Sequence, residues 1–188
     1  MSTLFSDHTI ETAPSETVPA LKGTLAKFGF VPAAMARLAE SPSATEGFLR
    51  ILAIFERSSL GPVEREVLAM TVGHEVGCEV CVALHSAALS HDPSTLPLVE
   101  PLRHQASLAD PRLEALRLFT RRAMAGGGRV PELQLQAFLD AGFTTRQALD
   151  VVLGIATYTL STFANRLTGA PLDPPFEVFR WRRDAAAV

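Results

Sequence analysis

Two cysteines and a histidine form the group with the clearest chemical potential in this chain of 188 residues. Cys78 and Cys81, the only cysteines, are three residues apart, and His85 follows four residues later within GCEVCVALHSAAL. On an α-helix these spacings place all three side chains on one face. Gly77 predicts a break before that helix, so both thiols fall near its start, where the helix dipole favours a thiolate. The group therefore supplies a nucleophile, a second thiol that can close a disulfide, and a base.

A carboxylate on the preceding helix completes the predicted site. The chain after Pro62 has the pattern of a helix that stops at Gly77. If the two helices form an antiparallel hairpin, Glu66 lies about 16 Å back from the turn and His85 about 12 Å beyond it. Because the two are nearly level, Glu66 is placed to orient His85, as a third group orients the base of a catalytic triad. The helix is uncharged and apolar on all sides from 67 to 73, so periodicity leaves open whether Glu64 or Glu66 faces inward.

Other interpretations fit parts of this pattern. Cysteines are common core residues, although two placed at random fall three apart only about 1% of the time in such a chain. A zinc site would use both cysteines and His85 together with His74, because structural zinc draws its ligands from two elements. A thioredoxin-like redox motif would follow a strand, and a c-type haem would need a histidine where Val82 stands. The pattern fits neither of these last two.

The rest of the chain carries the start and stop signals typical of a series of helices. No alternating strand pattern with hairpin turns occurs, so the sequence predicts an all-α fold, a single domain of about seven or eight helices. The apolar window 151–164, bracketed by Asp150 and Asn165, is predicted to be a buried core helix. The predicted helix starts are Ser43 with Glu46, Gly61–Pro62, Asp110–Pro111, Pro131, and Thr144 with Gln147, and the predicted stops are Gly77, the glycines at 126–128, Gly142 and Gly169.

Composition limits the classes of function. The chain is 47% hydrophobic and 20% charged, as in a globular domain that also forms a sizeable subunit interface. A net charge of −3 argues against nucleic acid as the main partner, and the window 151–164 is too short to span a membrane. The glycine run at 126–128 lacks a flanking strand, so no cofactor-binding motif is predicted.

The two ends of the chain carry their own predictions. Residues 1–19 lack the basic and apolar regions of a secretory signal and are expected to form an N-terminal arm that docks on another subunit. Residues 20–188 are expected to form the all-helical domain. The protein is accordingly expected in the cytoplasm, where paired cysteines are more often catalytic or metal-binding than structural.

The site residues also resemble a known family. The pattern E-x11-C-x-x-C-x3-H, here Glu66, Cys78, Cys81 and His85, is similar to that of the alkylhydroperoxidase D-like proteins of the carboxymuconolactone decarboxylase superfamily. The approach LGPVEREVLAMTVGHEVGCEVC resembles the helix hairpin of that family. FGFVPAAMARLAESP and TYTLSTFANRLTGAPLD resemble segments of its peroxidase-related branch, so the likeness extends from about residue 20 onward.

This resemblance implies a function and a role for each residue. It implies an all-α fold that assembles as a homotrimer or homohexamer, and a thiol peroxidase without metal or other cofactor. Cys81 would attack a hydroperoxide and become a sulfenic acid, Cys78 would resolve it to a disulfide, and Glu66 and His85 would relay protons. A dithiol or protein reductant would then restore the thiols. Dipole reasoning alone instead favours Cys78 as the thiol with the lower pKa.

One departure from the family pattern bears on this expectation. Well-characterised members carry a histidine between the cysteines, C-x-H-C, where this chain has Val80. Glu79 is a poor substitute because its negative charge opposes thiolate formation. Two alternatives therefore remain at this stage. One is a decarboxylase-like lyase that uses Glu66 and His85 for acid–base chemistry, and the other is a non-catalytic redox-sensing or structural oligomer.

Overall fold

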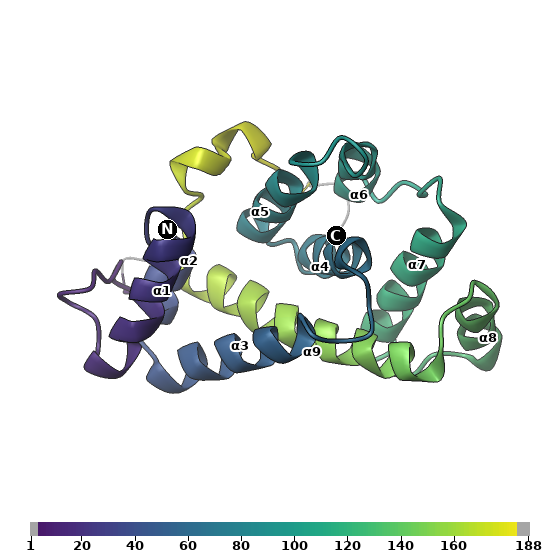
Figure 1. Ribbon diagram of the computed structural model, residues 1–188, viewed down its shortest axis with the longest axis horizontal. Helices are drawn as coiled ribbons and strands as arrows, with labels where there is room; N and C mark the ends of the chain where they lie inside the picture. Colours follow the sequence, from purple (N-terminus) through teal and green to yellow (C-terminus); the bar gives the residue numbers. More distant parts are fainter. Residues whose placement is uncertain (1–3, 184–188) are drawn as a thin grey trace.

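The computed structural model describes residues 4–183 of the chain, so residues 1–3 of the predicted arm and 184–188 of the predicted domain lie outside it. Across 4–183 the protein contains α-helices and short 3-10 helices and no β-strand, which confirms the all-α prediction (Figure 1). The α-helices are α1 (Val18–Phe28), α2 (Ala33–Leu38), α3 (Pro42–Phe55), α4 (Pro62–Val76), α5 (Glu79–Ser90), α6 (Val99–Arg103), α7 (Pro111–Ala125), α8 (Glu132–Asp140) and α9 (Thr145–Thr168). The 3-10 helices are η1 (Ser15–Thr17), η2 (Leu96–Leu98) and η3 (Pro174–Phe179).

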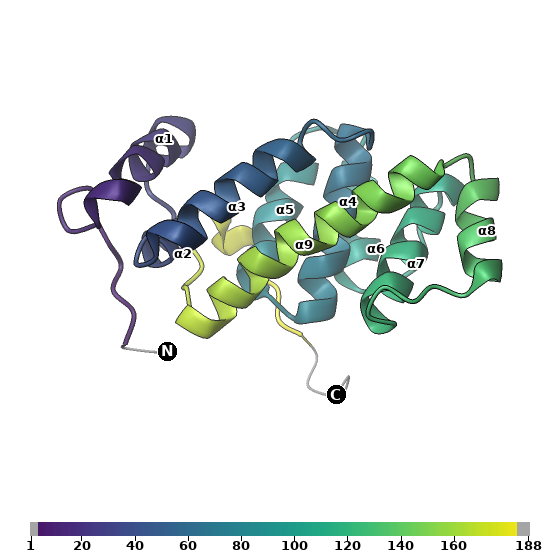
Figure 2. The same cartoon turned by 90° about the horizontal axis from the view of Figure 1, so that it is seen from below.

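Helix α4 is the centre of the fold. It packs against α5, α7 and α9, which surround it in Figure 1. All seven of its residues from 67 to 73 are buried, as expected for a helix that is apolar on every side. Figure 2 shows α3 and α9 side by side across one face, with α4 and α5 behind them. This arrangement places the α4–α5 hairpin, which carries the predicted site, against the middle of α9.

Most helix boundaries follow the sequence signals. Pro62 is the first residue of α4, Asp110 caps α7 by accepting from two backbone N–H groups, and Thr144 and Gln147 form a capping box at α9. Gly169 ends α9 in the left-handed conformation, with φ of 64°.

The predicted start at Ser43 is wrong. The N-cap of α3 is Ser41, whose hydroxyl accepts a hydrogen bond from the backbone N–H of Ala44. Pro42 then occupies the first helical position, where its fixed φ favours an earlier start.

Two further expectations need correction. Nine α-helices lie within residues 4–183, rather than seven or eight, because α2 and α6 have only six and five residues. Helices of fewer than two turns show no apolar period that a sequence pattern can reveal. The window 151–164 is also not buried all round, since Val152 is 51% exposed and Phe163 59% exposed. Helix α9 buries one face against α4 and α3 and leaves an apolar face open.

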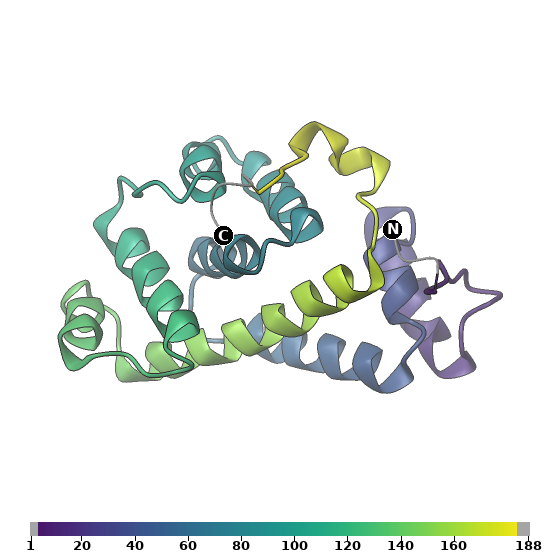
Figure 3. The same cartoon turned by 180° about the vertical axis from the view of Figure 1, so that it is seen from behind.

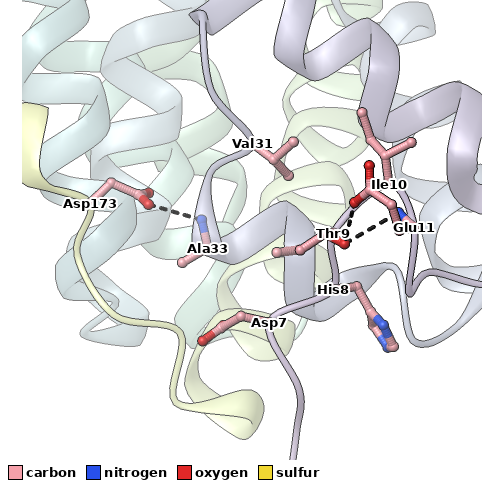
Figure 4. Close-up of a pocket in the computed structure, with 9 residues that line it drawn as sticks. Asp7, His8, Thr9, Ile10, Glu11, Val31, Ala33 and Asp173 are labelled. Atoms are coloured by element: carbon pink, nitrogen blue, oxygen red, sulfur yellow. Dashed lines mark hydrogen bonds between the residues drawn. The ribbon is translucent and has the colours of Figure 1, made fainter.

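The N-terminal segment lies against α2 of its own chain. Asp7 accepts a hydrogen bond of 2.6 Å from Nε of Arg37. Residues 7–11 line a cavity of about 360 Å³ (Figure 4). Asp173 also lines this cavity and accepts a hydrogen bond from the backbone N–H of Ala33. Helix α1 begins at Val18. Docking of the arm on another subunit and its boundary after residue 19 stay predictions.

The C-terminal segment passes α2 on its way to α5, with the rings of Phe176 and Phe30 6.4 Å apart between centroids. After α9 the chain turns back, and η3 packs against α5 (Figure 3). Trp181 is buried and donates from its indole N–H to the backbone carbonyl of Arg103 at 3.0 Å. No helix among residues 4–183 is both long and apolar enough to cross a membrane.

Gly154 marks the closest approach of α9 to its neighbours. A Cβ atom there would lie 2.6 Å from Cε2 of Phe55 and 2.8 Å from Cδ1 of Leu68, two fully buried side chains. We expect Gly154→Ala to lower the free energy of unfolding by about 1–3 kcal/mol through overpacking, although alanine is the better helix former. Urea unfolding measures the change. The matched control is Gly47→Ala in α3, where a Cβ meets nothing within 4 Å, and equal stability of the two variants would contradict the close packing.

Candidate active site

The cysteine pair is positioned by the turn between α4 and α5. Gly77 adopts φ of 74°, and the N–H of Cys78 donates to the carbonyl of Gly73 at 2.9 Å, which closes α4 in a Schellman-type turn. Cys78 is then the N-cap of α5, and its sulfur accepts from the backbone N–H of Cys81 at 3.4 Å. The two Sγ atoms are 2.9 Å apart, and both thiols are free and buried. Because a disulfide bond is about 2.05 Å long, only a small movement separates the pair from a covalent link.

The two thiols have opposite pKa shifts. The pKa of Cys78 falls to about 7, chiefly because the Cys81 thiol donates a hydrogen bond to its thiolate. Burial opposes this change, while the Cys81 N–H, the Asn165 amide and the charge of Arg166 support it. The pKa of Cys81 is raised by its hydrogen bond to Cys78, by burial and by the neighbouring thiolate charge. The pair therefore loses one proton near neutral pH, and the charge resides first on Cys78, as the dipole argument predicts.

Access, however, favours Cys81. A cavity of about 720 Å³ opens beside the pair, and Cys81 lines it whereas Cys78 does not. A molecule in this cavity meets Cys81 first. The lower pKa of Cys78 and the better access of Cys81 are compatible. The sulfurs are 2.9 Å apart, so a proton can pass from one to the other and the pair titrates as a unit with one negative charge.

Glu66 and His85 form the predicted pair across the helix hairpin. Nδ1 of His85 lies 2.8 Å from Oε2 of Glu66, and both residues line the same cavity as Cys81. Burial alone would raise the pKa of Glu66, but the charge and hydrogen bond of His85, together with the charges of Arg65 and Lys27, lower that pKa overall. Glu64 faces elsewhere, accepting from the backbone N–H of Gly61 and pairing with Arg112. The structure thus places Glu66, rather than Glu64, against His85.

Helix α9 adds residues that the sequence analysis did not select. The Nδ2 of Asn165 lies 3.3 Å from Sγ of Cys81 and 3.9 Å from Sγ of Cys78, so one amide contacts both sulfurs. The ring of Tyr158 packs edge-on against His85, with 5.1 Å between centroids. Burial, followed by the charges of Glu66 and Glu56, raises the pKa of Tyr158, so its hydroxyl stays protonated. The sequence did carry a signal for these two residues, because both are polar positions on a largely apolar helix. Asn165 was used only as the end of the apolar window, and Tyr158 was not considered.

The zinc arrangement does not form. His74 packs against the ring of Trp181, with centroids 4.8 Å apart, and its Nδ1 lies 2.7 Å from the amide nitrogen of Gln105. Among residues 4–183, no three His, Cys, Asp or Glu side chains gather in a way that could hold a metal ion. His74 is therefore a packing residue at the C-terminal end of α4.

The fold is shared with known proteins at low sequence identity. No protein-family model matches the sequence, and neither does any curated protein. An uncharacterized peroxidase-related protein from Ralstonia eutropha JMP134, described as an alkylhydroperoxidase AhpD core, has a TM-score of 0.81 at 22% identity. The alignment covers 95% of this chain and 97% of that one. The chain thus has the alkylhydroperoxidase D-like fold, and the resemblance seen in the sequence is confirmed at the level of the fold.

Two other structures extend this comparison. An uncharacterized peroxidase-related protein from Silicibacter sp. TM1040 has a TM-score of 0.77 at 21% identity, over 95% of this chain and 97% of its own. The debrominase Bmp8, as a Cys-to-Ala variant bound to 2,3,4-tribromopyrrole, has a TM-score of 0.77 at 13% identity, over 95% and 96%. Proteins described with two different chemistries therefore share this fold, so the fold alone does not identify the reaction.

Proposed function

We propose that this protein is an enzyme of the alkylhydroperoxidase type, a thiol peroxidase that reduces organic hydroperoxides through Cys78 and Cys81. The observation that carries the proposal is the pair of sulfurs 2.9 Å apart, with Cys81 open to a cavity that His85 and Glu66 also line. The nucleophile and a proton carrier thus line one cavity, and the resolving thiol of Cys78 contacts the nucleophile from outside that lining. The shared fold with peroxidase-related proteins supports the same class.

The reaction balances without a cofactor. The Cys81 thiolate attacks the outer oxygen of the hydroperoxide, the O–O bond breaks, and an alcohol leaves with one proton while Cys81 becomes a sulfenic acid. The Cys78 sulfur then attacks the Cys81 sulfur and releases water, which forms the disulfide. A dithiol or protein reductant gives two electrons and two protons to restore both thiols.

His85 and Glu66 serve the proton transfers in this scheme. The departing alkoxide needs a proton, and a histidine beside the nucleophile is suited to donate one near neutral pH. Glu66 accepts a hydrogen bond from Nδ1 of His85, so the other ring nitrogen, Nε2, is the one left for the substrate. Tyr158 packs against the same ring and limits its rotation.

Asn165 offsets the missing histidine at position 80. Val80 has no polar group, so it cannot stabilise a thiolate in the way that the family's imidazole is expected to. The Asn165 amide, which contacts both sulfurs, donates to the thiolate from helix α9. A hydrogen bond to the charged form lowers the pKa of a thiol.

One experiment tests the proposal directly. The reduced protein is treated anaerobically with one equivalent of cumene hydroperoxide, and its thiols are measured by mass spectrometry. We expect a prompt loss of two hydrogens with a Cys78–Cys81 crosslink and release of one equivalent of cumyl alcohol. Two thiols that stay reduced would refute the peroxidase. If another activity is found and a Cys78→Ser/Cys81→Ser variant keeps it while His85→Ala loses it, the lyase alternative is correct.

Reductive debromination is a second candidate, favoured by the debrominase that shares the fold and by the apolar cavity beside Cys81. An aryl bromide and the two thiols would give the arene, bromide, one proton and the same disulfide. Bromide release from 2,3,4-tribromopyrrole, with no alcohol from cumene hydroperoxide, would favour it over the peroxidase. For either reaction we also propose that the protein is cytoplasmic and assembles as a homotrimer or homohexamer.

A further inference from the structure

The cavity beside Cys81 is much larger than a small peroxide requires. Its volume of about 720 Å³ falls within the range of about 300–1,000 Å³ typical of sites for drug-sized ligands. A water molecule, close in size to hydrogen peroxide, takes about 30 Å³ of liquid. Glu66, His85 and Asn165 line the cavity together with Cys81, and much of the remaining lining is apolar, including Phe28, Met35, Leu38, Phe48, Leu52 and Leu84.

The charges around the cavity do not suit an anionic substrate. Lys27 is the only lysine or arginine lining it within residues 4–183, and two glutamates, Glu56 and Glu66, line it as well. Glu66 lies at the reactive end, where it is engaged by His85. Because two carboxylates and one ammonium group line the cavity, a substrate carboxylate bound within it would meet an excess of negative charge at low effective dielectric, which is unfavourable.

Helix α1 forms the wall that limits the size of an occupant. The lining positions 19, 20, 23, 24, 27 and 28 fall on one face of this helix, and Gly23 lies near the middle of that face. A Cβ atom added at Gly23 would meet nothing within 4 Å. Gly23 is itself exposed and lines the cavity, so a side chain added there would narrow the cavity without displacing a neighbour.

We propose that Gly23 determines the size of hydroperoxide that this site accepts, and that the site takes uncharged hydroperoxides in preference to anionic ones. This inference rests on the proposed peroxidase function and concerns the same site. The hydroperoxide group meets Cys81 beside His85, and the apolar body of the substrate lies between α1 and α5. The reaction has the balance given above, and the organic product is the corresponding neutral alcohol.

The test uses two matched glycine variants. Gly23→Leu fills the cavity wall, and Gly47→Leu is the control, because Gly47 also lies within a helix with open space at its Cβ but does not line the cavity. The substrates are the methyl ester of linoleic acid hydroperoxide, the free acid, and hydrogen peroxide, each with the same dithiol reductant. The measurement is kcat/KM.

We expect wild type and Gly47→Leu to use the ester at least about tenfold better than the free acid. Gly23→Leu should lose about tenfold or more on the ester and keep its rate on hydrogen peroxide within about twofold. Equal kcat/KM for the ester in the two variants would overturn the role of Gly23. Equal use of acid and ester by wild type would overturn the preference for uncharged substrates.

A binding measurement separates this inference from the proposed chemistry. The uncharged fluorescent probe N-phenyl-1-naphthylamine is titrated into each reduced protein. Binding to wild type and Gly47→Leu that weakens about tenfold in Gly23→Leu supports an uncharged apolar ligand at this site, even if no peroxide is reduced and the peroxidase proposal fails. Equal binding to all three proteins would overturn the inference whatever the activity.

Discussion

Cys81→Ser is expected to reduce hydroperoxide turnover by about 10³-fold or more, since among residues 4–183 it removes the only thiol that lines the cavity. The serine hydroxyl cannot take its place, because its pKa lies far above that of a thiol and oxygen forms no sulfenic acid. Coupled consumption of the dithiol reductant, followed with cumene hydroperoxide, measures the loss. Turnover that survives Cys81→Ser would refute the assignment of the attack to Cys81.

Cys78→Ser is the matched control for that experiment and should lose turnover at a later step of the reaction. It leaves the nucleophile in place but removes the resolving sulfur at 2.9 Å. One equivalent of hydroperoxide should be consumed, after which Cys81 persists as a sulfenic acid that dimedone labels. If instead Cys78→Ser abolishes even this first equivalent while Cys81→Ser retains it, then Cys78, whose pKa is about 7, is the attacking thiol.

Asn165→Ala is expected to slow reaction of the cysteine pair with iodoacetamide at pH 7 by about tenfold. A hydrogen bond to a charged group contributes about 1.5–3 kcal/mol, and the Asn165 amide contacts both sulfurs. In wild type the alkylation rate should rise with pH through about 7, where the pair loses its first proton. In the variant this midpoint should move to higher pH, because the thiolate has lost a donor while the protonated form is unchanged.

Two variants show whether this effect is local. Leu167→Ala changes an exposed side chain on the same helix and should leave the alkylation profile unchanged. Val80→His in the Asn165→Ala background introduces an imidazole between the cysteines and should recover part of the lost reactivity. An unshifted profile in Asn165→Ala would mean that the amide fills space without stabilising the thiolate.

The α4–α5 hairpin could be predicted because its determinants are local. Gly77 adopts the left-handed conformation at little steric cost and so favours the break, and the i, i+3 and i+7 spacing fixes the shared face of Cys78, Cys81 and His85. The level of Glu66 against His85 followed from the 1.5 Å rise per residue, roughly constant in any helix. The sequence did not predict that Glu66, rather than Glu64, faces His85, because that orientation depends on which other groups surround α4. Arg112 engages Glu64 from 48 residues away.

The sequence by itself therefore determined the helical class, most helix ends and the composition of the cysteine site, since these depend on neighbours within about two turns of helix. Only the tertiary structure decided which sulfur meets the cavity and which groups complete the site. Asn165 lies 84 residues beyond Cys81 in the chain, and α1 contributes the far wall from 50 or more residues before it. Such contacts come from the packing of α9 and α1 around the hairpin, and helical periodicity carries no information about them. The physical reason is that local hydrogen bonding sets the helices, whereas burial of their apolar faces sets which distant residues meet.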